Sequence, residues 1–278
     1  MTINRILLFG STGMLGNYIK VYFKDTIEII DIKFRITKES LEELENILNP
    51  YNLNENSCVI NCIGQIPQRM DEYSSNSLYF IVNSLFPHLL WSICKKNGSK
   101  MIQPTTDCVF SGKKADGGYI ETDLYDEEGL YGLSKSLGEP LGCTIIRTSI
   151  IGLEKYNKKS FLEWVLLNIK EDLTFNGYSN HYWNGITCLE YCNLISQIIT
   201  NDLFWVGVRH IKSPKSYSKF ELCLMIVDVF DKEFNKEKII EIKTSHIVNK
   251  TLNTLYAENI YIPDLSIQIK RLINFDIY

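Results

Sequence analysis

The chain has 278 residues, of which 45% are hydrophobic and 22% charged, and its formal net charge is −4. This is ordinary globular composition with enough apolar material for a full core, so neither disulfides nor a metal is needed to hold the fold. A nucleic-acid binder would show a basic surplus and a membrane protein an apolar run of roughly 18–20 residues; neither pattern is seen, so we expect neither partner.

The first half of the chain alternates short apolar runs with helical patterns, which is typical of βαβ units and a parallel sheet. In chain order, these patterns predict strands at 3–9, 26–32, 58–63, 100–104 and 144–151, and helices at 14–23, 39–48, 77–96 and 131–139. Pro50 and Pro140 stand just beyond two of these helices, where proline stops a helix.

After residue 152 the pattern changes, with helices expected at 160–169, 187–200 and 219–230 and strands at 173–175, 206–211 and 239–242. We therefore predict an α/β fold, a Rossmann-type doubly wound parallel sheet with a smaller C-terminal α/β substrate-binding lobe. The Rossmann domain takes residues 1–152 and the lobe residues 153–278, with a soft boundary across which segments can interleave. The lobe would cover the carboxyl ends of the strands, where ligands bind in such sheets.

Three glycines, Gly10, Gly13 and Gly16, follow the first predicted strand and open the first predicted helix. Glycine permits the tight turn and lets the backbone approach a pyrophosphate closely, and the helix N-terminus offers free N–H groups. In this strand–turn–helix context the motif predicts a dinucleotide site. The predicted contacts also include the residues between the glycines: Thr12, Met14 and Leu15.

The second predicted strand carries opposing signals for the choice of cofactor. Asp31 lies 21 positions after Gly10, where an acidic residue holds the ribose 2′-hydroxyl of NAD. Lys33 and Arg35 follow closely, and either could meet the 2′-phosphate of NADP. We therefore expect both NADH and NADPH to serve.

The predicted catalytic set consists of Thr106, Tyr131 and Lys135. Tyr131 and Lys135 stand at i and i+4 of the helix predicted at 131–139, on one face and about one turn apart. Tyrosine has an unperturbed pKa of about 10, which a nearby ammonium lowers by favouring the phenolate. The same lysine can hydrogen-bond a nicotinamide ribose. Thr106 follows the strand predicted at 100–104 and can donate a hydrogen bond to a substrate carbonyl.

The eight cysteines include no Cys-x-x-Cys pair, and the four histidines do not cluster with them. This distribution argues against a zinc site. Most of the cysteines lie in apolar runs, where a thiol behaves as a small buried hydrophobic group. The pattern favours a reducing compartment. Because the N-terminal apolar run leads directly into the glycine turn, it is interpreted as a strand and not as a signal peptide, and we expect a cytoplasmic protein.

Six motifs, taken together and in order, resemble those of the extended short-chain dehydrogenase/reductases. They are Gly10-Ser-Thr-Gly13-Met-Leu-Gly16, Val59-Ile-Asn61-Cys, Val82-Asn83, Thr105-Thr106-Asp107-Cys-Val-Phe110-Ser-Gly112, Tyr131-Gly-Leu-Ser-Lys135 with Gly138-Glu139, and Ile146-Arg147-Thr148-Ser149. Among these enzymes the chain is most similar to the dTDP-4-dehydrorhamnose reductase group. The resemblance covers residues 3–152 well and is weaker beyond them.

The resemblance implies that NADPH or NADH reduces the 4-keto group of a nucleotide-linked 6-deoxyhexose, in the supply of deoxysugars for polysaccharides. Tyr131 would protonate the new alkoxide, Lys135 would tune Tyr131 and hold the cofactor ribose, and Thr106 would polarise the carbonyl. A homodimer is compatible with this resemblance. The further cofactor contacts that it implies are Cys62, Ile63, Gly64 and Asn83, and the further substrate contacts are Asp107, Val109 and Phe110.

Two segments depart from the pattern of the reductases, namely residues 62–69 and residues 180–187. Within them Arg69, His181 and Trp183 could recognise a different hexose, for example one that carries a 2-acetamido group on UDP. Simple core packing is an equally good explanation for Trp183, since aromatic side chains contribute to cores as often as to ligand contacts.

Three rival functions share this fold. A sugar 4,6-dehydratase places a glutamate directly after the Thr-Asp pair, where this chain has Cys108, a poor proton donor for loss of water. A nucleotide-sugar epimerase stays open as an alternative. So does a regulatory subunit that binds cofactor without turnover, although such a subunit has no chemical need for Thr106, Tyr131 and Lys135 together.

Overall fold

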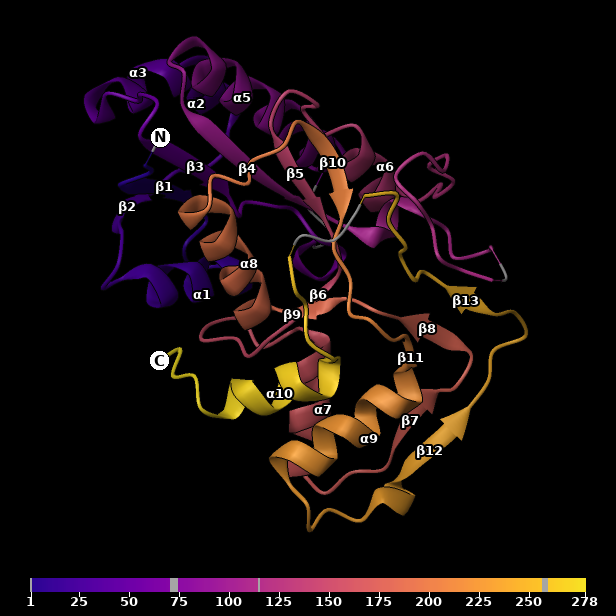
Figure 1. Cartoon of the computed structure of the whole chain (residues 1–278). Coiled ribbons are helices and arrows are strands. Elements are labelled where there is room, and N and C mark those ends of the chain that lie inside the picture. The colour runs from indigo at the N-terminus through magenta and orange to yellow at the C-terminus, as the bar shows by residue number, and fades with distance from the viewer. Residues whose placement is uncertain (1, 71–74, 115, 257–259) are drawn as a thin grey trace.

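The computed structural model describes residues 2–70, 75–114, 116–256 and 260–278 (Figure 1). Its centre is a six-stranded sheet in the order β10-β5-β4-β3-β1-β2, in which every neighbouring pair is parallel. The strands are β1 (Arg5–Phe9), β2 (Glu28–Ile32), β3 (Ser57–Asn61), β4 (Lys100–Thr105), β5 (Thr144–Arg147) and β10 (Gly207–His210). The predicted α/β Rossmann-type fold is thereby confirmed.

Helices cover both faces of this sheet because its strands carry apolar side chains in both directions. On β1, Ile6 and Leu8 point into one core and Leu7 and Phe9 into the other. Figure 1 shows the helices that cover these faces. The first face packs against α1 (Met14–Phe23) and α8 (Cys188–Thr200), and the second against α2 (Lys38–Glu42), α3 (Leu44–Leu48) and α5 (Phe86–Lys96).

A continuous helical segment, Ser77–Lys96, runs through α4 (Ser77–Phe80), a π-helical stretch, η3 (Ile81–Leu85), and α5. The sequence shows no uninterrupted apolar run long enough to span a membrane. Among the helices of the described residues, however, this segment is the one with the length and the mean hydropathy, 1.3, to cross a membrane. Phe86, Leu90 and Cys94 are fully buried in the core beside the sheet. Such burial is typical of a core helix in a globular domain.

The C-terminal lobe shares one continuous core with the sheet, since Leu8, Ile195, Leu222 and Leu265 belong to the same buried cluster. The lobe contains two of the small sheets. In one of them β7 pairs with β12, and in the other β8 lies between β11 and β13. Its elements are α7 (Phe161–Lys170), β7 (Phe175–Tyr178), β8 (His181–Trp183), β11 (Tyr217–Ser218), α9 (Lys219–Phe230), β12 (Ile239–Ile242), β13 (Val248–Asn249) and α10 (Leu265–Ile273). Short 3-10 turns are η1 (Asn49–Tyr51), η2 (Pro67–Arg69), η4 (Asp107–Val109) and η5 (Lys236–Lys238).

Five predicted elements differ clearly from the structure. The strand predicted at 173–175 shares only Phe175 with β7. The helix predicted at 39–48 is divided into α2 and α3, and the helix predicted at 131–139 ends at Ser136, before Gly138 packs directly on the Asn83 carbonyl. The strand predicted at 144–151 is divided into β5 and β6 (Ile150–Ile151). There the Ser149 carbonyl accepts a hydrogen bond from the Ile186 N–H, and β6 pairs with β9 (Ile186–Thr187). The strand predicted at 206–211, from the C-terminal half, joins the central sheet as β10.

Candidate active site

The strand order of the sheet reverses between β1 and β3, and ligands bind at such a point in open α/β sheets. Gly10 ends β1 with a left-handed φ of +77°, and a Cβ on it would lie 2.8 Å from the Cys62 carbonyl carbon. A Cβ on Gly16 would lie 2.1 Å from the Gly10 oxygen. Only glycines permit this packing of turn, helix and neighbouring strand at the N-terminus of α1, where free N–H groups can bind an anion.

Asp31 lies at the end of β2, next to this glycine turn. The Lys20 ammonium donates a hydrogen bond of 2.8 Å to Asp31 Oδ2. Burial opposes ionisation of Asp31, but this hydrogen bond and the lysine charge hold its pKa below the usual value. Asp31 Oδ1 is buried, and no group among the described residues donates a hydrogen bond to it. Lys33, two residues on, is exposed.

The segment after β3 joins the glycine turn to the catalytic helix. Asn83 Oδ1 accepts a hydrogen bond of 2.9 Å from the Gln65 N–H, and Asn83 Nδ2 donates one of 3.0 Å to Ser134 Oγ. The Asn83 side chain is therefore engaged in holding this segment against α6 (Leu130–Ser136). A Cβ on Gly64 would lie 3.0 Å from Lys135 Nζ, so the missing side chain leaves room for the ammonium. Cys62 and Ile63 lie partly exposed in the same segment.

The three predicted catalytic residues meet where α6 packs on the turn after β4. The Thr106 hydroxyl lies close enough to the Tyr131 phenol to favour its ionisation, against the effect of burial. Thr106 Oγ1 accepts a hydrogen bond of 3.1 Å from the Cys108 N–H. A Cβ on Gly132 would lie 2.2 Å from the Cys108 carbonyl oxygen, so a glycine beside Tyr131 permits this close approach. Tyr131 and Lys135 are both partly exposed at the same site.

Burial changes the ionisation of both members of the catalytic pair. It raises the pKa of Tyr131 well above the usual value, and the charges of Cys108 and Asp107 act in the same direction. It lowers the pKa of Lys135 to about 8, against the opposing charge of Glu139. In the protein alone the Tyr131 phenol is therefore neutral near pH 7. The prediction from the sequence was different, namely that Lys135 lowers the pKa of Tyr131.

A cavity of about 430 Å³ opens beside Tyr131. Its other lining residues are Pro67, Met70, Asn76, Tyr79, Gly129 and Leu130. The Tyr79 and Tyr131 rings lie 6.4 Å apart. The cavity provides room for a ligand against the phenol of Tyr131.

The predicted substrate residues occupy different environments. Asp107 is buried next to Thr106, and burial raises the pKa of its carboxyl against the charges of Lys250 and Lys219. Val109 and Phe110 are also buried, in a small cluster in which the Phe110 ring stacks on Tyr119 at 4.2 Å. Both side chains therefore support the catalytic turn from within.

The predicted substrate residues from the two divergent segments, Arg69, His181 and Trp183, also differ in their surroundings. Arg69 is exposed on η2, near the cavity but outside its lining. Trp183 is 3% exposed and belongs to the main core, so the core-packing alternative describes it. The His181 ring stacks on Tyr178 at 4.4 Å, and His181 Nε2 lies 2.9 Å from Thr244 Oγ1.

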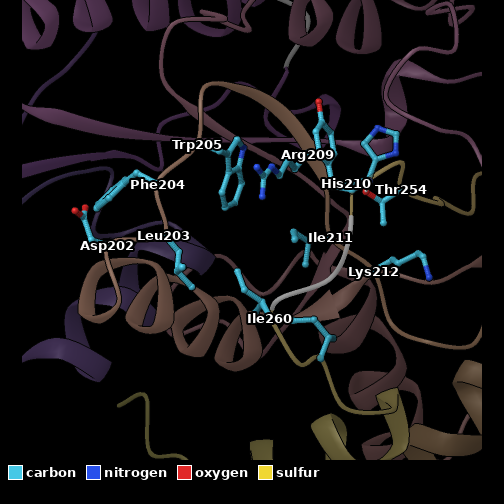
Figure 2. Close-up of a pocket in the computed structure, with 12 residues that line it drawn as sticks. Asp202, Leu203, Phe204, Trp205, Arg209, His210, Ile211, Lys212, Thr254 and Ile260 are labelled. Atoms are coloured by element: carbon cyan, nitrogen blue, oxygen red, sulfur yellow. Dashed lines mark hydrogen bonds between the residues drawn. The ribbon is translucent and has the colours of Figure 1, made fainter.

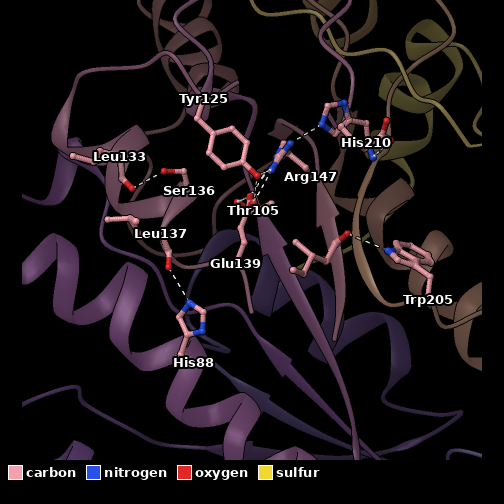
Figure 3. A network of polar contacts seen from close by, with 12 residues as sticks. His88, Thr105, Tyr125, Leu133, Ser136, Leu137, Glu139, Arg147, Trp205 and His210 are labelled. Carbon is pink, nitrogen blue, oxygen red and sulfur yellow. Dashed lines mark hydrogen bonds and ion pairs between the residues drawn. The ribbon is translucent and has the colours of Figure 1, made fainter. Parts of the chain in front are cut away.

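A buried ion pair between Arg147 and Glu139, which was not predicted from the sequence, stabilises the elements that carry the site (Figure 3). Arg147 Nη2 donates a hydrogen bond of 2.6 Å to Glu139 Oε2, and both side chains are almost completely buried. Thr105 and Tyr125 donate further hydrogen bonds to the same carboxylate, of 2.9 and 2.8 Å. Glu139 follows α6, so this network ties the catalytic helix to the carboxyl ends of β4 and β5.

The network continues to β10 through His210. Arg147 Nη1 lies 2.8 Å from His210 Nε2, and since arginine only donates, Nε2 must accept. His210 Nδ1 then carries the proton and donates it to the carbonyls of Tyr119 and Asn253. Burial and the Arg147 charge lower the pKa of His210 to about 4, so the ring is neutral.

A second cavity, of about 270 Å³, lies along β10 and contains none of the predicted site residues (Figure 2). The Arg209 guanidinium lies between the rings of Trp205 and Tyr256, 4.9 and 4.6 Å from their centroids. Of the predicted catalytic residues, Tyr131 lines the other cavity, and we take that cavity as the candidate active site.

Comparisons with known proteins agree with this geometry. The model of the family described as RmlD substrate binding domain matches residues 4–256. The chain is similar to the dTDP-4-dehydrorhamnose reductase of Bacillus anthracis in complex with NADP (TM-score 0.80, 18% identity, 99% of this chain and 98% of that chain). It is also similar to the dTDP-4-dehydrorhamnose reductase of Yersinia enterocolitica (TM-score 0.78, 20% identity, 98% and 99%).

The dTDP-glucose 4,6-dehydratase of Bacillus anthracis in complex with NAD has the same fold (TM-score 0.74, 15% identity, 97% and 95%). No curated protein sequence matches the chain. At these identities the solved structures establish the fold, while the family match spans most of the chain.

Proposed function

The chain belongs to the RmlD substrate binding domain family, as its motifs indicated, and on that premise we propose that it is an NAD(P)H-dependent nucleotide-sugar 4-ketoreductase. The observation that carries this proposal is that Tyr131, which lies beside Thr106 and lines a cavity, shares α6 with Lys135, whose ammonium lies beside Gly64. Solved structures of similar fold include dTDP-4-dehydrorhamnose reductases, one of them with NADP. The proposed substrate is a dTDP- or UDP-linked 4-keto-6-deoxyhexose.

The bound cofactor supplies hydride to C4 of the sugar. The carbonyl oxygen at C4 would lie against the Thr106 hydroxyl and the Tyr131 phenol, both of which can hydrogen-bond it. As negative charge develops on this oxygen, Tyr131 transfers its proton to it. Burial keeps Tyr131 protonated at neutral pH, which suits an acid in a reduction. Lys135, in the space left by Gly64, would hold the cofactor ribose and stabilise the phenolate that forms.

The glycine turn and Asp31 fit a dinucleotide. The glycine turn suits a pyrophosphate, because glycines let the backbone approach a ligand closely and the N-terminus of α1 offers free N–H groups. The unpartnered Asp31 Oδ1 suits a ribose hydroxyl. The exposed Lys33 suits a 2′-phosphate. These observations support use of both NADH and NADPH.

Replacement of Asp31 with Ala is expected to weaken NADH more than NADPH, because only NADH offers a 2′-hydroxyl to this carboxylate. Titration of both cofactors by the fluorescence of the reduced nicotinamide measures the two dissociation constants. Equal losses for both cofactors would mean that Asp31 does not contact the 2′-position.

We expect kcat/KM to fall as the pH rises through about 8, because Lys135 loses its proton there. Tyr131 stays protonated over this range, since burial raises its pKa well above the usual value. A pH profile of the wild type and of Lys135→Met checks the assignment. A descending limb of unchanged position in the variant would assign the ionisation to another group.

The direct experiment mixes the protein with NADPH and, separately, dTDP- or UDP-linked 4-keto-6-deoxyhexoses, with and without a 2-acetamido group. Loss of the reduced-nicotinamide absorbance with one sugar supports the proposal and identifies the sugar class. No loss with any of them, alongside measurable NADPH binding, would favour an epimerase or a non-catalytic subunit. We place the reaction in the cytoplasm, since all eight cysteines are free thiols and most are buried.

A further inference from the structure

The cavity along β10 takes no part in the mechanism above, and among the described residues it shares no lining with the cavity at Tyr131. Figure 2 shows Trp205, Ile211 and Ile260 around its centre. Its volume of about 270 Å³ lies just under the range of roughly 300–1,000 Å³ for pockets that hold drug-sized ligands. The apolar side chains of the lining are Leu203, Phe204, Trp205, Ile211, Ile260 and Ile262. Such walls suit a small organic molecule.

Arg209 places a guanidinium in the wall of this cavity. The group lies over the rings of Trp205 and Tyr256, 4.9 and 4.6 Å from their centroids, and cation–π contacts hold it there. Its N–H donors lie in its own plane, so they stay free to point away from rings stacked on its faces. Within residues 2–70, 75–114, 116–256 and 260–278, no group accepts a hydrogen bond from the guanidinium and no carboxylate pairs with it.

The other ionisable side chains in the described lining are already engaged. Both ring nitrogens of His210 have partners, and the ring is neutral. Asp202 and Lys212 carry opposite charges, and each has a partner. The Thr254 hydroxyl donates a hydrogen bond of 2.6 Å to a glutamate outside the lining. Among these groups, Arg209 is therefore the one whose charge and donors are available to a ligand.

A guanidinium beside apolar walls is complementary to an anion with an apolar body. The planar fork of arginine matches the two oxygens of a carboxylate, which can accept two parallel charge-assisted hydrogen bonds. One guanidinium neutralises one negative charge, whereas a phosphate dianion would carry a second, unpaired charge into the cavity. We propose that this cavity binds a small organic monocarboxylate, with its carboxylate on Arg209 and its apolar body against Ile211 and Ile260. The site does not depend on the proposed reductase function.

A structural alternative makes Arg209 a clamp that holds Tyr256 against β10. Under that alternative, loss of the guanidinium lowers the stability of the protein, and the wild type binds no carboxylate in the cavity. Trp205 offers a signal that is specific to this place, because its ring lines the cavity and its Nε1 donates a hydrogen bond of 3.3 Å to the Ile145 carbonyl. The other three tryptophans, Trp91, Trp164 and Trp183, lie outside the lining.

The experiment follows the tryptophan indole N–H signals of the ¹⁵N-labelled protein by NMR, and Trp205→Phe assigns the signal of the cavity. Phenylacetate, hexanoate, phenylacetamide, acetate and phenyl phosphate are titrated into the wild type, Arg209→Met, Arg209→Lys, Ile211→Trp and Lys100→Met, with and without NADPH. A thermal melt of each protein measures its stability. Lys100 is the matched control, since its ammonium lies 5.3 Å from the ring of Phe204, a lining residue, but is itself outside the lining.

We expect phenylacetate and hexanoate to shift the Trp205 signal of the wild type in a saturable way, whether or not NADPH is present. Arg209→Met should weaken both carboxylates by about 10- to 100-fold, the range for hydrogen bonds to charged groups. Arg209→Lys, which keeps the charge without the fork, should lose less. Ile211→Trp should weaken binding by filling the cavity, and Lys100→Met should bind as the wild type does. Phenylacetamide lacks the charge and acetate lacks the apolar body, so both should bind more weakly than phenylacetate.

Absence of a saturable Trp205 shift with both carboxylates would overturn this inference and leave the structural clamp as the role of Arg209. Unchanged affinity in a folded Arg209→Met protein, or equal affinities for phenylacetate and phenylacetamide, would also overturn it. Tighter binding of phenyl phosphate than of phenylacetate would contradict the assignment to a monocarboxylate. Each of these results leaves the proposed reduction standing, because the cavity contains none of the residues assigned to it.

Discussion

Replacement of Tyr131 with Phe is expected to lower kcat by about 10²- to 10⁴-fold, the usual contribution of a positioned general acid. The phenol that lies beside Thr106 is the proton donor in the proposed reduction, and phenylalanine keeps the ring beside Tyr79 but has no proton to give. Cofactor affinity should change little, because Lys135 and the glycine turn stay in place. Steady-state rates and NADPH titration of the same preparation measure both quantities.

Leu133→Ala is a suitable control for that variant, since this side chain projects from the exposed side of the same helix. It should keep wild-type kcat. A Tyr131→Phe enzyme that retains wild-type turnover would remove Tyr131 from the mechanism, and with it the assignment of α6 as the catalytic helix.

Replacement of Glu139 with Gln is expected to destabilise the folded protein by about 3–5 kcal/mol, because it leaves a buried guanidinium without its charge partner. Arg147 is fully buried, and its other hydrogen-bond partners, His210 and Tyr125, are neutral, so no second anion of the network compensates. Denaturant unfolding of the wild type and the variant measures the difference in the free energy of unfolding.

The matched control breaks an ion pair at the surface. Asp228 pairs with Lys236, and about half of each side chain is exposed. Asp228→Asn should change the unfolding free energy by about 0–1 kcal/mol, since exposed pairs contribute little. Similar effects of Glu139→Gln and Asp228→Asn would show that the buried network does not hold the catalytic helix to the sheet.

Local patterns predicted most of the Rossmann half. The helix at 14–23 and the strands around it follow from apolar periodicity next to a glycine turn, and the structure has α1 at Met14–Phe23. Local sequence patterns fail where contacts between residues far apart in the sequence determine the bounds of an element. The run at 144–151 has apolar pairs near both ends, yet the Ser149 carbonyl accepts a hydrogen bond from the Ile186 N–H and β6 pairs with β9. Contacts with the C-terminal half of the chain therefore determine the break.

The same distinction holds at the site. The spacing of Tyr131 and Lys135 is local, and the structure places Tyr131 beside Thr106 and Lys135 beside Gly64. Helix α9 is predicted at its observed bounds, but nothing near it in the sequence indicates that the ammonium of Lys219, its first residue, packs against the rings of Phe161 and Trp183.

The most direct test of the proposed reduction supplies NADPH that carries deuterium at the transferable position of the nicotinamide, together with the 4-keto sugar that the protein consumes. The product is then examined by NMR and mass spectrometry. We predict one deuterium atom, bonded to C4 of the sugar, in stoichiometric amount with the oxidised cofactor. A product without deuterium at C4, or an isomerised sugar formed without net consumption of NADPH, would contradict the assignment as a 4-ketoreductase.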